Sequence, residues 1–134
     1  MNLNLLPCYR DARGSIQMIF ENCDIKSISR IESFPNTYRA RHAHEEIHWC
    51  EVLEGQVEYY ETMLENGKIV GKVTRQVFNK GDIFVNIPGS FHEMFFPCHT
   101  VFNCYATAGR EQKDYEKGLI KIPDLSLKEF YERN

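Results

Sequence analysis

Features that mark membrane and secreted proteins are missing from this sequence of 134 residues. No stretch approaches the roughly 20 consecutive apolar residues that a membrane-spanning helix needs. The first residues, MNLNLLPCYRDARG, lack the basic start and the long apolar centre of a secretory signal. We therefore expect a cytoplasmic protein that does not enter a membrane.

Blocks of like charge, internal repeats and Pro-, Gly- or Ser-rich linkers are also missing. The net charge of -3 comes from interspersed acidic and basic residues, so no basic stripe favours nucleic acid. An apolar content of 43% in 134 residues is enough for one core. We predict a single domain over residues 1–134, whose partner is a small molecule rather than nucleic acid or membrane.

The cysteines form an odd set of five with no C-x-x-C pair. This argues against both a disulfide framework and a zinc ribbon. We expect reduced thiols that act mainly as small buried side chains.

Short segments rich in β-branched and aromatic residues alternate with turn sequences such as Asn66-Gly67 and Pro88-Gly89-Ser90. Strands are predicted over residues 15–20, 25–34, 47–55, 56–63, 68–78, 82–88, 92–96 and 100–107. Many short strands at this spacing indicate an all-β sandwich or barrel.

Only the C-terminal segment DLSLKEFYERN predicts a helix. Ser126 fits a helix N-cap, Glu129 follows three residues later as in a capping box, and Leu127 begins an apolar stripe. This helix should pack on the outside of the barrel or against a second subunit. Exposed barrel edges and apolar outward positions predict a homodimer.

Three of the five histidines, His42, His44 and His48, lie in the segment YRARHAHEEIHWCEVLEG. If one strand runs through them without a bulge, they face the same side, because side chains in a strand alternate. Imidazole is a poor filler for an apolar interior, since burial penalises its charged form and leaves its nitrogens in need of partners. A divalent metal would explain the cluster, although His42 and His44 could instead be solvated on a loop before the strand.

The same segment resembles the first motif of the cupins, G-x5-H-x-H-x(3,4)-E-x6-G. HAHEEIHWCEVLEG supplies H-x-H and the closing Gly55, with His48 where the family has glutamate. GDIFVNIPGSFH is similar to the second motif, with His92 at its histidine. The resemblance implies a cupin fold, a double-stranded β-helix or jelly-roll barrel, with His42, His44, His48 and His92 as metal ligands.

Four neutral ligands would leave the full double positive charge of a divalent ion at the site, so such a centre should prefer anionic ligands. The ion could be Fe, Ni, Zn, Mn or Cu. An open coordination sphere would allow it to polarise a carbonyl, whereas a closed tetrahedral zinc site would be structural. The sequence does not separate these two arrangements.

A further resemblance is to the sugar-nucleotide branch of the cupins, the dTDP-4-dehydrorhamnose 3,5-epimerases and dTDP-sugar 3,4-ketoisomerases. It lies in RDARGSIQMIFE, YRARHAH, FHEMFF and KDYEKGLIKIPDLS. These enzymes move protons next to a keto group without a metal. The resemblance implies His42 or His44 as the base and Tyr105 or Tyr38 as the acid. It also implies that Arg39 or Arg41 binds the diphosphate.

Together these patterns predict a metal-binding cupin that isomerises or epimerises a sugar or sugar nucleotide next to a carbonyl. One alternative is an Fe(II)-dependent cupin dioxygenase acting on a small organic substrate. Another is a barrel that binds a small ligand without turnover. Strand parity turns Trp49 and Glu51 away from His48, and Glu46 and Glu93 are candidates for hydrogen bonds to ligand histidines.

Overall fold

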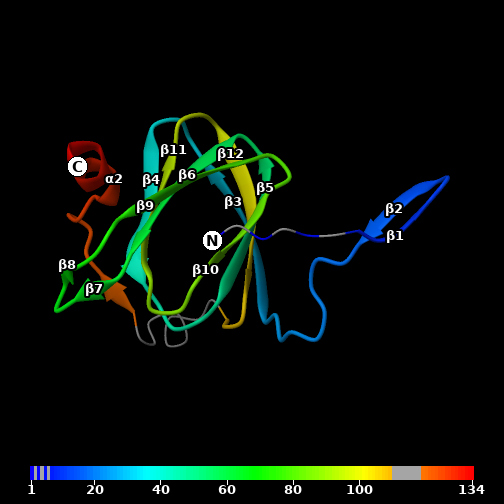
Figure 1. The fold of residues 1–134 in the computed structure, drawn as a ribbon, viewed down its shortest axis with the longest axis horizontal. Helices are drawn as coiled ribbons and strands as arrows, with labels where there is room; N and C mark the ends of the chain where they lie inside the picture. The colour runs from blue at the N-terminus through cyan, green and yellow to red at the C-terminus, as the bar shows by residue number, and fades with distance from the viewer. Residues whose placement is uncertain (2, 4, 6, 110–118) are drawn as a thin grey trace.

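Two antiparallel sheets face each other and form a barrel (Figure 1). This computed structural model describes residues 1–134 except for 2, 4, 6 and 110–118. The first sheet contains, in spatial order, β10 (Ile83–Asn86), β5 (His48–Glu54), β12 (Thr100–Ala106) and β3 (Ser27–Ser33). The second contains β13 (Ile120–Lys121), β4 (Thr37–Ala43), β11 (Phe91–Phe96), β6 (Gln56–Thr62) and β9 (Thr74–Asn79).

Two hairpins lie outside these sheets. The hairpin of β1 (Pro7–Asp11) and β2 (Gly14–Gln17) extends away from the barrel (Figure 1). The second, β7 (Leu64–Glu65) and β8 (Lys68–Ile69), turns at Asn66 and Gly67, whose φ angles are 51° and 74°. Two consecutive residues with positive φ are typical of the type I′ turn that joins tight hairpins, as the Asn-Gly sequence predicts.

The predicted all-β class with one short C-terminal helix is confirmed, but the strand list needs corrections. Residues 68–78 do not form one strand, because the chain leaves extended pairing around Gly71. As a result β8 folds back on β7 while β9 pairs with β6. The prediction also missed β1, β4, β7 and β13, of which β4 carries His42.

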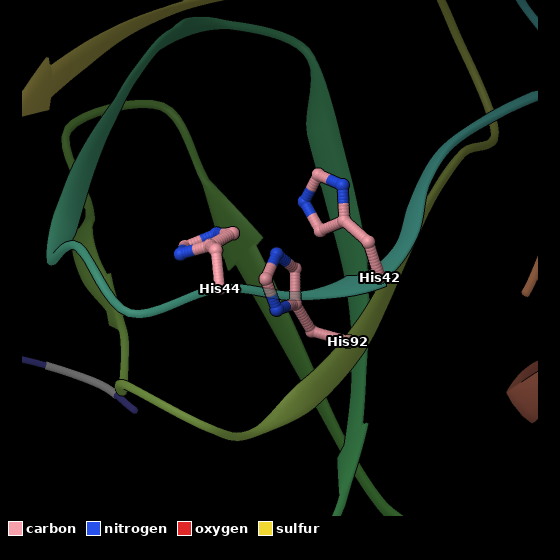
Figure 2. Close-up of side chains that lie close together, drawn as sticks. All are labelled: His42, His44 and His92. Atoms are coloured by element: carbon pink, nitrogen blue, oxygen red, sulfur yellow. The ribbon is translucent and has the colours of Figure 1, made fainter. Parts of the chain in front are cut away.

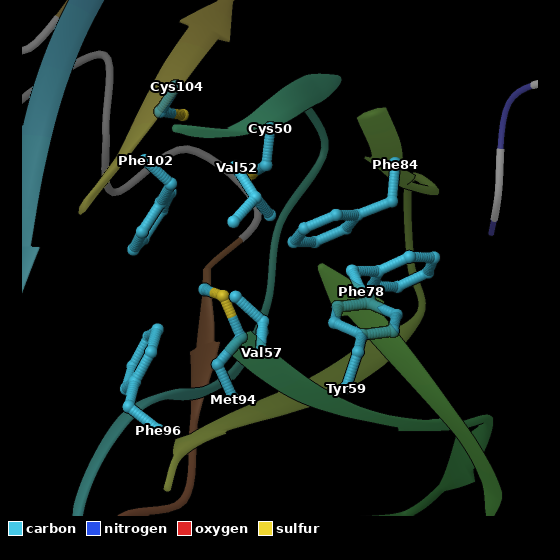
Figure 3. Packing of buried hydrophobic residues seen from close by; sticks show 10 residues of the cluster. All are labelled: Cys50, Val52, Val57, Tyr59, Phe78, Phe84, Met94, Phe96, Phe102 and Cys104. Atoms are coloured by element: carbon cyan, nitrogen blue, oxygen red, sulfur yellow. The ribbon is translucent and has the colours of Figure 1, made fainter. Parts of the chain in front are cut away.

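The barrel interior is filled from both sheets by alternating side chains. On β12, for example, Phe102 and Cys104 are buried between partly exposed neighbours. Figure 3 shows the main cluster, in which aromatic rings from β6, β9, β10, β11 and β12 pack around smaller residues. The Phe78 and Phe84 rings stack with centroids 4.3 Å apart.

Helix α2 (Leu127–Arg133) packs on the outside of the barrel beside β11 and β6 (Figure 1). The Ser126 hydroxyl caps it by accepting a hydrogen bond from the backbone N–H of Glu129, as predicted. The Glu129 carboxylate accepts a hydrogen bond from Arg133 rather than from the backbone N–H of Ser126, which a complete capping box would require. No helix in the described part of the chain has the length and apolar character needed to cross a bilayer.

Gly55, the closing glycine of the first motif, allows a close approach between the turn after β5 and the start of β12. Its φ is +86°, and a Cβ atom there would lie 2.4 Å from the His99 carbonyl oxygen and 2.8 Å from the Thr100 Cα. Backbone atoms cannot move aside as a flexible side chain can. Glycine is therefore required at this position by both its φ angle and the available space.

Candidate functional site

The histidines come from both sheets and meet inside the barrel. His42 is near the end of β4, and its register partner on β11 is His92. His44 follows β4, and His48 begins β5 in the other sheet. The histidines therefore do not share one strand, so the parity argument was wrong about how they come together.

His42, His44 and His92 form the tightest group (Figure 2). One ring nitrogen from each lies within 4.8 Å of the others. The ring centroids are 4.7 Å apart for His42 and His92 and 5.0 Å apart for the other two pairs. This spacing allows three imidazole nitrogens to reach one ion after small side-chain movements.

Hydrogen bonds fix which nitrogen of His44 and His92 can act as a ligand. His44 Nδ1 is 2.9 Å from the Glu46 carbonyl oxygen, and His92 Nδ1 is 3.1 Å from that of Ser90. Because a carbonyl only accepts, both Nδ1 atoms carry the proton and both Nε2 atoms present a lone pair. Both Nε2 atoms are buried and have no hydrogen-bond partner among the described residues. Burial of these two Nε2 atoms without a partner costs free energy unless a ligand binds them. Two imidazole lone pairs held in this way fit a metal ion.

His48 has a different environment. Its ring stacks on that of His44 with centroids 4.3 Å apart. Its Nε2 lies 3.2 Å from a carboxylate oxygen of Glu46, whose side chain is only 7% exposed. His44, Glu46 and His48 thereby form a second group of possible ligands that shares His44 with the first. The structure thus divides the predicted four-histidine site into two overlapping sets.

A cavity of about 150 Å³ opens beside these histidines. Its apolar lining comes from Ile31, Ala40, Met94 and Phe102, and its polar lining from Arg39, His42, His48, Cys50, Asn86, His92 and Cys104. None of these described lining residues carries a carboxylate, and Arg39 brings a fixed positive charge. The cavity therefore favours an anionic or electron-rich molecule.

A bulge in β4 decides which arginine reaches the cavity. Ala40 and Arg41 have φ angles of 74° and 59°, and the pairing with β11 shifts here, so that His92 faces His42 but Glu93 faces Ala40. The extra residue changes the side-chain alternation, and Arg39 comes to line the same cavity as His42. Arg39 is held by hydrogen bonds to the Ser33 hydroxyl and the Glu32 carbonyl oxygen.

Arg41 instead lies on the outer side of β4. Its Nε donates to the Glu93 carboxylate at 2.6 Å, and its Nη1 donates to the Pro123 carbonyl oxygen at 2.8 Å. The fully buried Glu93 also accepts from the backbone N–H of Lys128. Glu93 therefore anchors α2 to the barrel, and none of its hydrogen bonds described here goes to a ligand histidine.

The two predicted tyrosine acids also lie outside the cavity. Tyr105 donates to Glu51 at 2.7 Å and packs against Phe20, on the opposite face of β12 from Cys104. Tyr38 is 40% exposed and packs against Phe95. The alternation along β12 was a usable signal for Tyr105. Trp49 and Glu51 point outward, as the strand parity predicted. His99 is exposed and pairs with Glu32.

Asn86 is a lining residue that sequence reasoning missed. It ends β10, is buried, and its side-chain amide donates to the hydroxyl of Tyr59 at 3.0 Å. The Tyr59 ring in turn lies against His92, with centroids 5.9 Å apart. An asparagine in the otherwise apolar segment DIFVNIP was the available signal, because a buried amide needs polar partners.

Burial lowers the pKa of His44, and the neighbouring His48 lowers it further. Burial also lowers the pKa of His92 well below its ordinary value of 6.5, with His42 and His44 adding to the effect. Both rings are thus neutral in the folded protein near pH 7, as metal ligands must be.

These shifts predict that the metal-free protein loses stability as the pH falls below about 6.5. Below this pH, His44 and His92 bind protons in the unfolded chain but remain neutral in the folded protein. Proton binding therefore lowers the free energy of the unfolded state relative to the folded state. Stability is full above pH 6.5 and falls by up to about 1.4 kcal/mol per pH unit for each histidine down to its folded pKa. Urea unfolding in the presence of a chelator from pH 7.5 to 5.5 measures this. A flat profile in wild type, or one that His92→Gln leaves unchanged, would contradict it.

Comparison with solved structures identifies the fold. The chain is similar to dTDP-4-dehydrorhamnose 3,5-epimerase from Elizabethkingia anophelis, with a TM-score of 0.70, 14% identity and coverage of 95% of this chain and 80% of that one. It is also similar to the QdtA 3,4-ketoisomerase from Thermoanaerobacterium thermosaccharolyticum in complex with TDP. There the TM-score is 0.64, the identity 20%, and the coverage 98% and 92%.

The capsular polysaccharide assembling protein CapF from Staphylococcus aureus has a similar region, with a TM-score of 0.64 and 14% identity. The match covers 90% of this chain but only 33% of CapF. No protein-family model matches this chain, and no curated protein does. The predicted resemblance to cupins of the sugar-nucleotide branch is confirmed as a likeness of fold. The part of that resemblance in residues 113–118 lies outside the described residues.

Proposed function

We propose that the protein is a metal-binding isomerase or epimerase that moves a proton next to a carbonyl group of a sugar or sugar nucleotide. The observation that carries this proposal is the pair of buried Nε2 lone pairs of His44 and His92, which converge with His42 beside the cavity. The fold shared with sugar-nucleotide epimerases and ketoisomerases supports the substrate class.

His42, His44 and His92 would hold a divalent transition metal ion, of which Fe, Ni, Zn, Mn and Cu all accept imidazole ligands. When bound, the ion would supply Lewis acidity that polarises a substrate carbonyl. Three neutral ligands preserve its charge, and no carboxylate among the described lining residues offsets it. An anionic intermediate such as an enolate would be stabilised in this environment.

His48 is the group that we assign to proton transfer. The expected bases, His42 and His44, each contribute a nitrogen to the group of possible metal ligands that they form with His92, whereas the Nε2 of His48 faces Glu46. That carboxylate would accept a hydrogen bond from Nε2 and orient the ring, leaving Nδ1 to exchange a proton with a molecule in the cavity. His48 would then return the proton to complete the isomerisation.

Arg39 would bind an anionic part of the substrate. A cavity of about 150 Å³ is smaller than the roughly 300–1,000 Å³ of pockets that enclose drug-sized molecules. It can therefore accept only a ring-sized part of a sugar nucleotide, and the rest would lie over the opening. Two of the similar structures contain related molecules: the nucleotide TDP in the ketoisomerase, and the sugar nucleotide dTDP-4-keto-L-rhamnose in an epimerase from Legionella pneumophila.

The proposal predicts that the protein exchanges carbon-bound hydrogen of dTDP-4-keto-L-rhamnose for deuterium from D₂O. Mass spectrometry would detect deuterium next to the keto group even when no net isomerisation occurs. His48→Gln should slow this exchange by about 10²–10⁴-fold, the usual contribution of a general base. Tyr105→Phe is the matched control and should keep the wild-type rate, because Tyr105 faces away from the cavity.

Equal exchange rates in wild type and His48→Gln would remove His48 from the mechanism. No exchange with any keto-sugar nucleotide, by a folded and metal-loaded protein, would overturn the proposed activity.

A second function is favoured by the group of His44, Glu46 and His48. Two histidines and one carboxylate are the ligand set of non-haem Fe(II) oxygenases. In that case the protein would be an Fe(II)-dependent dioxygenase for a small organic substrate. Substrate-dependent oxygen uptake that requires added Fe(II) would identify this function, since the isomerase consumes no oxygen.

The assembly that we propose is a homodimer in which the β1–β2 hairpin lies on a second copy of the chain. A two-stranded hairpin is only marginally stable by itself in water. This one leaves Tyr9 53% and Ile16 62% exposed. Analytical ultracentrifugation is expected to give twice the mass of one chain, and Ile16→Asp to give the monomer with unchanged circular dichroism. A wild-type monomer at high micromolar concentration would contradict this assembly.

A further inference from the structure

Two cysteines face each other inside the cavity. Cys50 on β5 and Cys104 on β12 are direct register partners. Both line the cavity, although only 1% and 3% of their surfaces are exposed. Both thiols are reduced, and Figure 3 shows them on neighbouring strands at one end of the core cluster.

The hydrogen bonds around this pair establish how close the two residues are. The N–H of Thr107 donates to the Ile47 carbonyl oxygen, and these residues continue the register of β12 and β5. Hydrogen-bonded and non-hydrogen-bonded pairs alternate along antiparallel strands, which makes Cys104 and Cys50, three steps away, a non-hydrogen-bonded pair.

A bond on the other side of β5 agrees with this assignment. The N–H of Val52 donates to Asp82, just before β10, so the even-numbered residues of β5 direct their backbone groups away from β12. In a non-hydrogen-bonded pair the Cα atoms are about 4.5 Å apart, and disulfides span Cα distances of about 4.4–6.8 Å. The two sulfurs can therefore bond without a change of register.

We propose that Cys50 and Cys104 are a hydroperoxide-sensitive dithiol that closes into a cross-strand disulfide within the cavity. This inference is independent of the proposed isomerase activity. A hydroperoxide such as hydrogen peroxide is small enough to enter a cavity of about 150 Å³.

The described lining of the cavity carries one fixed positive charge and no acidic side chain. The positive charge is that of Arg39, which lines the cavity together with both cysteines. Cys23 and Cys98 are exposed on the surface and line no part of this cavity.

The reaction balances without another cofactor. One thiolate attacks a peroxide oxygen, the O–O bond breaks, and a sulfenic acid forms as the first water leaves with the thiol proton. The second thiolate attacks the sulfenic sulfur, the S–O bond breaks, and a second water leaves. Two thiols are oxidised by two electrons in total, one peroxide is reduced to two waters, and a dithiol reductant reverses the change.

Closing this disulfide would alter the wall of the cavity on the strand that carries His48. Cys50 is two residues from His48 on β5, and side chains two apart in a strand share a face. The covalent link would also join β5 to β12 in the middle of the first sheet. Oxidation should raise the melting temperature by roughly 5–15 °C.

The test uses the wild-type chain in buffer with a metal chelator, which prevents metal-driven oxidation. After titration with hydrogen peroxide, the remaining thiols are alkylated under denaturing conditions and peptides are mapped without reduction. The expected result is loss of both labels together, with a Cys50–Cys104 linked peptide, at peroxide doses that leave Cys23 and Cys98 labelled. The Cys104→Ser variant should instead stop at a Cys50 sulfenic acid that dimedone traps.

Either of two results would overturn the proposal. One is that Cys50 and Cys104 keep their labels while the surface cysteines are oxidised. The other is that both become separate sulfinic acids with no linked peptide. The mapping in wild type stands by itself if Cys104→Ser does not fold.

Discussion

Replacing His92 with alanine is expected to remove the bound divalent metal, whereas Glu46→Gln retains it. His92 supplies one of the three converging nitrogens, so its loss should weaken binding by more than the roughly 10–100-fold typical of changes in residues that support a ligand. The Glu46 side chain contacts His48, and His44 is held by the Glu46 backbone carbonyl, which the substitution preserves. Elemental analysis of protein purified without a histidine tag measures the metal content.

Two further variants make this experiment specific. His44→Ala should lose the metal, because His44 belongs to both possible ligand groups. His99→Ala should keep it, since His99 is an exposed histidine paired with Glu32. Metal that survives His92→Ala but is lost in Glu46→Gln would move the site to His44, Glu46 and His48. A wild-type protein that takes up no Fe(II), Ni or Zn would leave a metal-free proton-transfer enzyme.

The strands that sequence predicted best are those in which apolar and polar residues alternate between clear turn sequences. β5 and β6 are examples, separated by Gly55. The strand that carries His42 was missed because the segment TYRARHA holds three basic side chains and no regular alternation. Its irregularity is physical, since the bulge at Ala40 and Arg41 breaks the period of two on which such predictions depend.

For the candidate site, the sequence predicted which histidines gather but not how their roles divide. Ligand spacing placed His42, His44, His48 and His92 together, and they are indeed neighbours. Whether His48 completes a metal site or pairs with Glu46 depends on side-chain positions between β4 and β5, which no local pattern encodes. The choice between Arg39 and Arg41 depends on the same bulge, because without it both would face the same side of β4.

Removing Arg41 should have the largest effect on stability. Its partner Glu93 is fully buried, and the charge of that carboxylate is compensated at 2.6 Å by the Arg41 guanidinium. Truncating one member of a buried ion pair leaves the other charge uncompensated and typically costs about 3–5 kcal/mol. We expect Arg41→Ala to lower the free energy of unfolding by about this amount in urea titrations. Arginine and alanine both carry a Cβ atom, so the backbone strain at position 41, where φ is 59°, is the same before and after the substitution.

Arg30→Ala is the matched control for this variant, because Arg30 is a strand arginine whose hydrogen bond to Asn103 is exposed. It should change stability by less than about 0.5 kcal/mol. The double variant Arg41→Met/Glu93→Met should recover part of the loss, since an apolar pair leaves no buried charge. A cost below about 1 kcal/mol for Arg41→Ala would show that the hydrogen bonds from the start of α2 suffice for Glu93. The bulge would then serve mainly to turn Arg39 toward the cavity, and the outward arginine would be incidental to it.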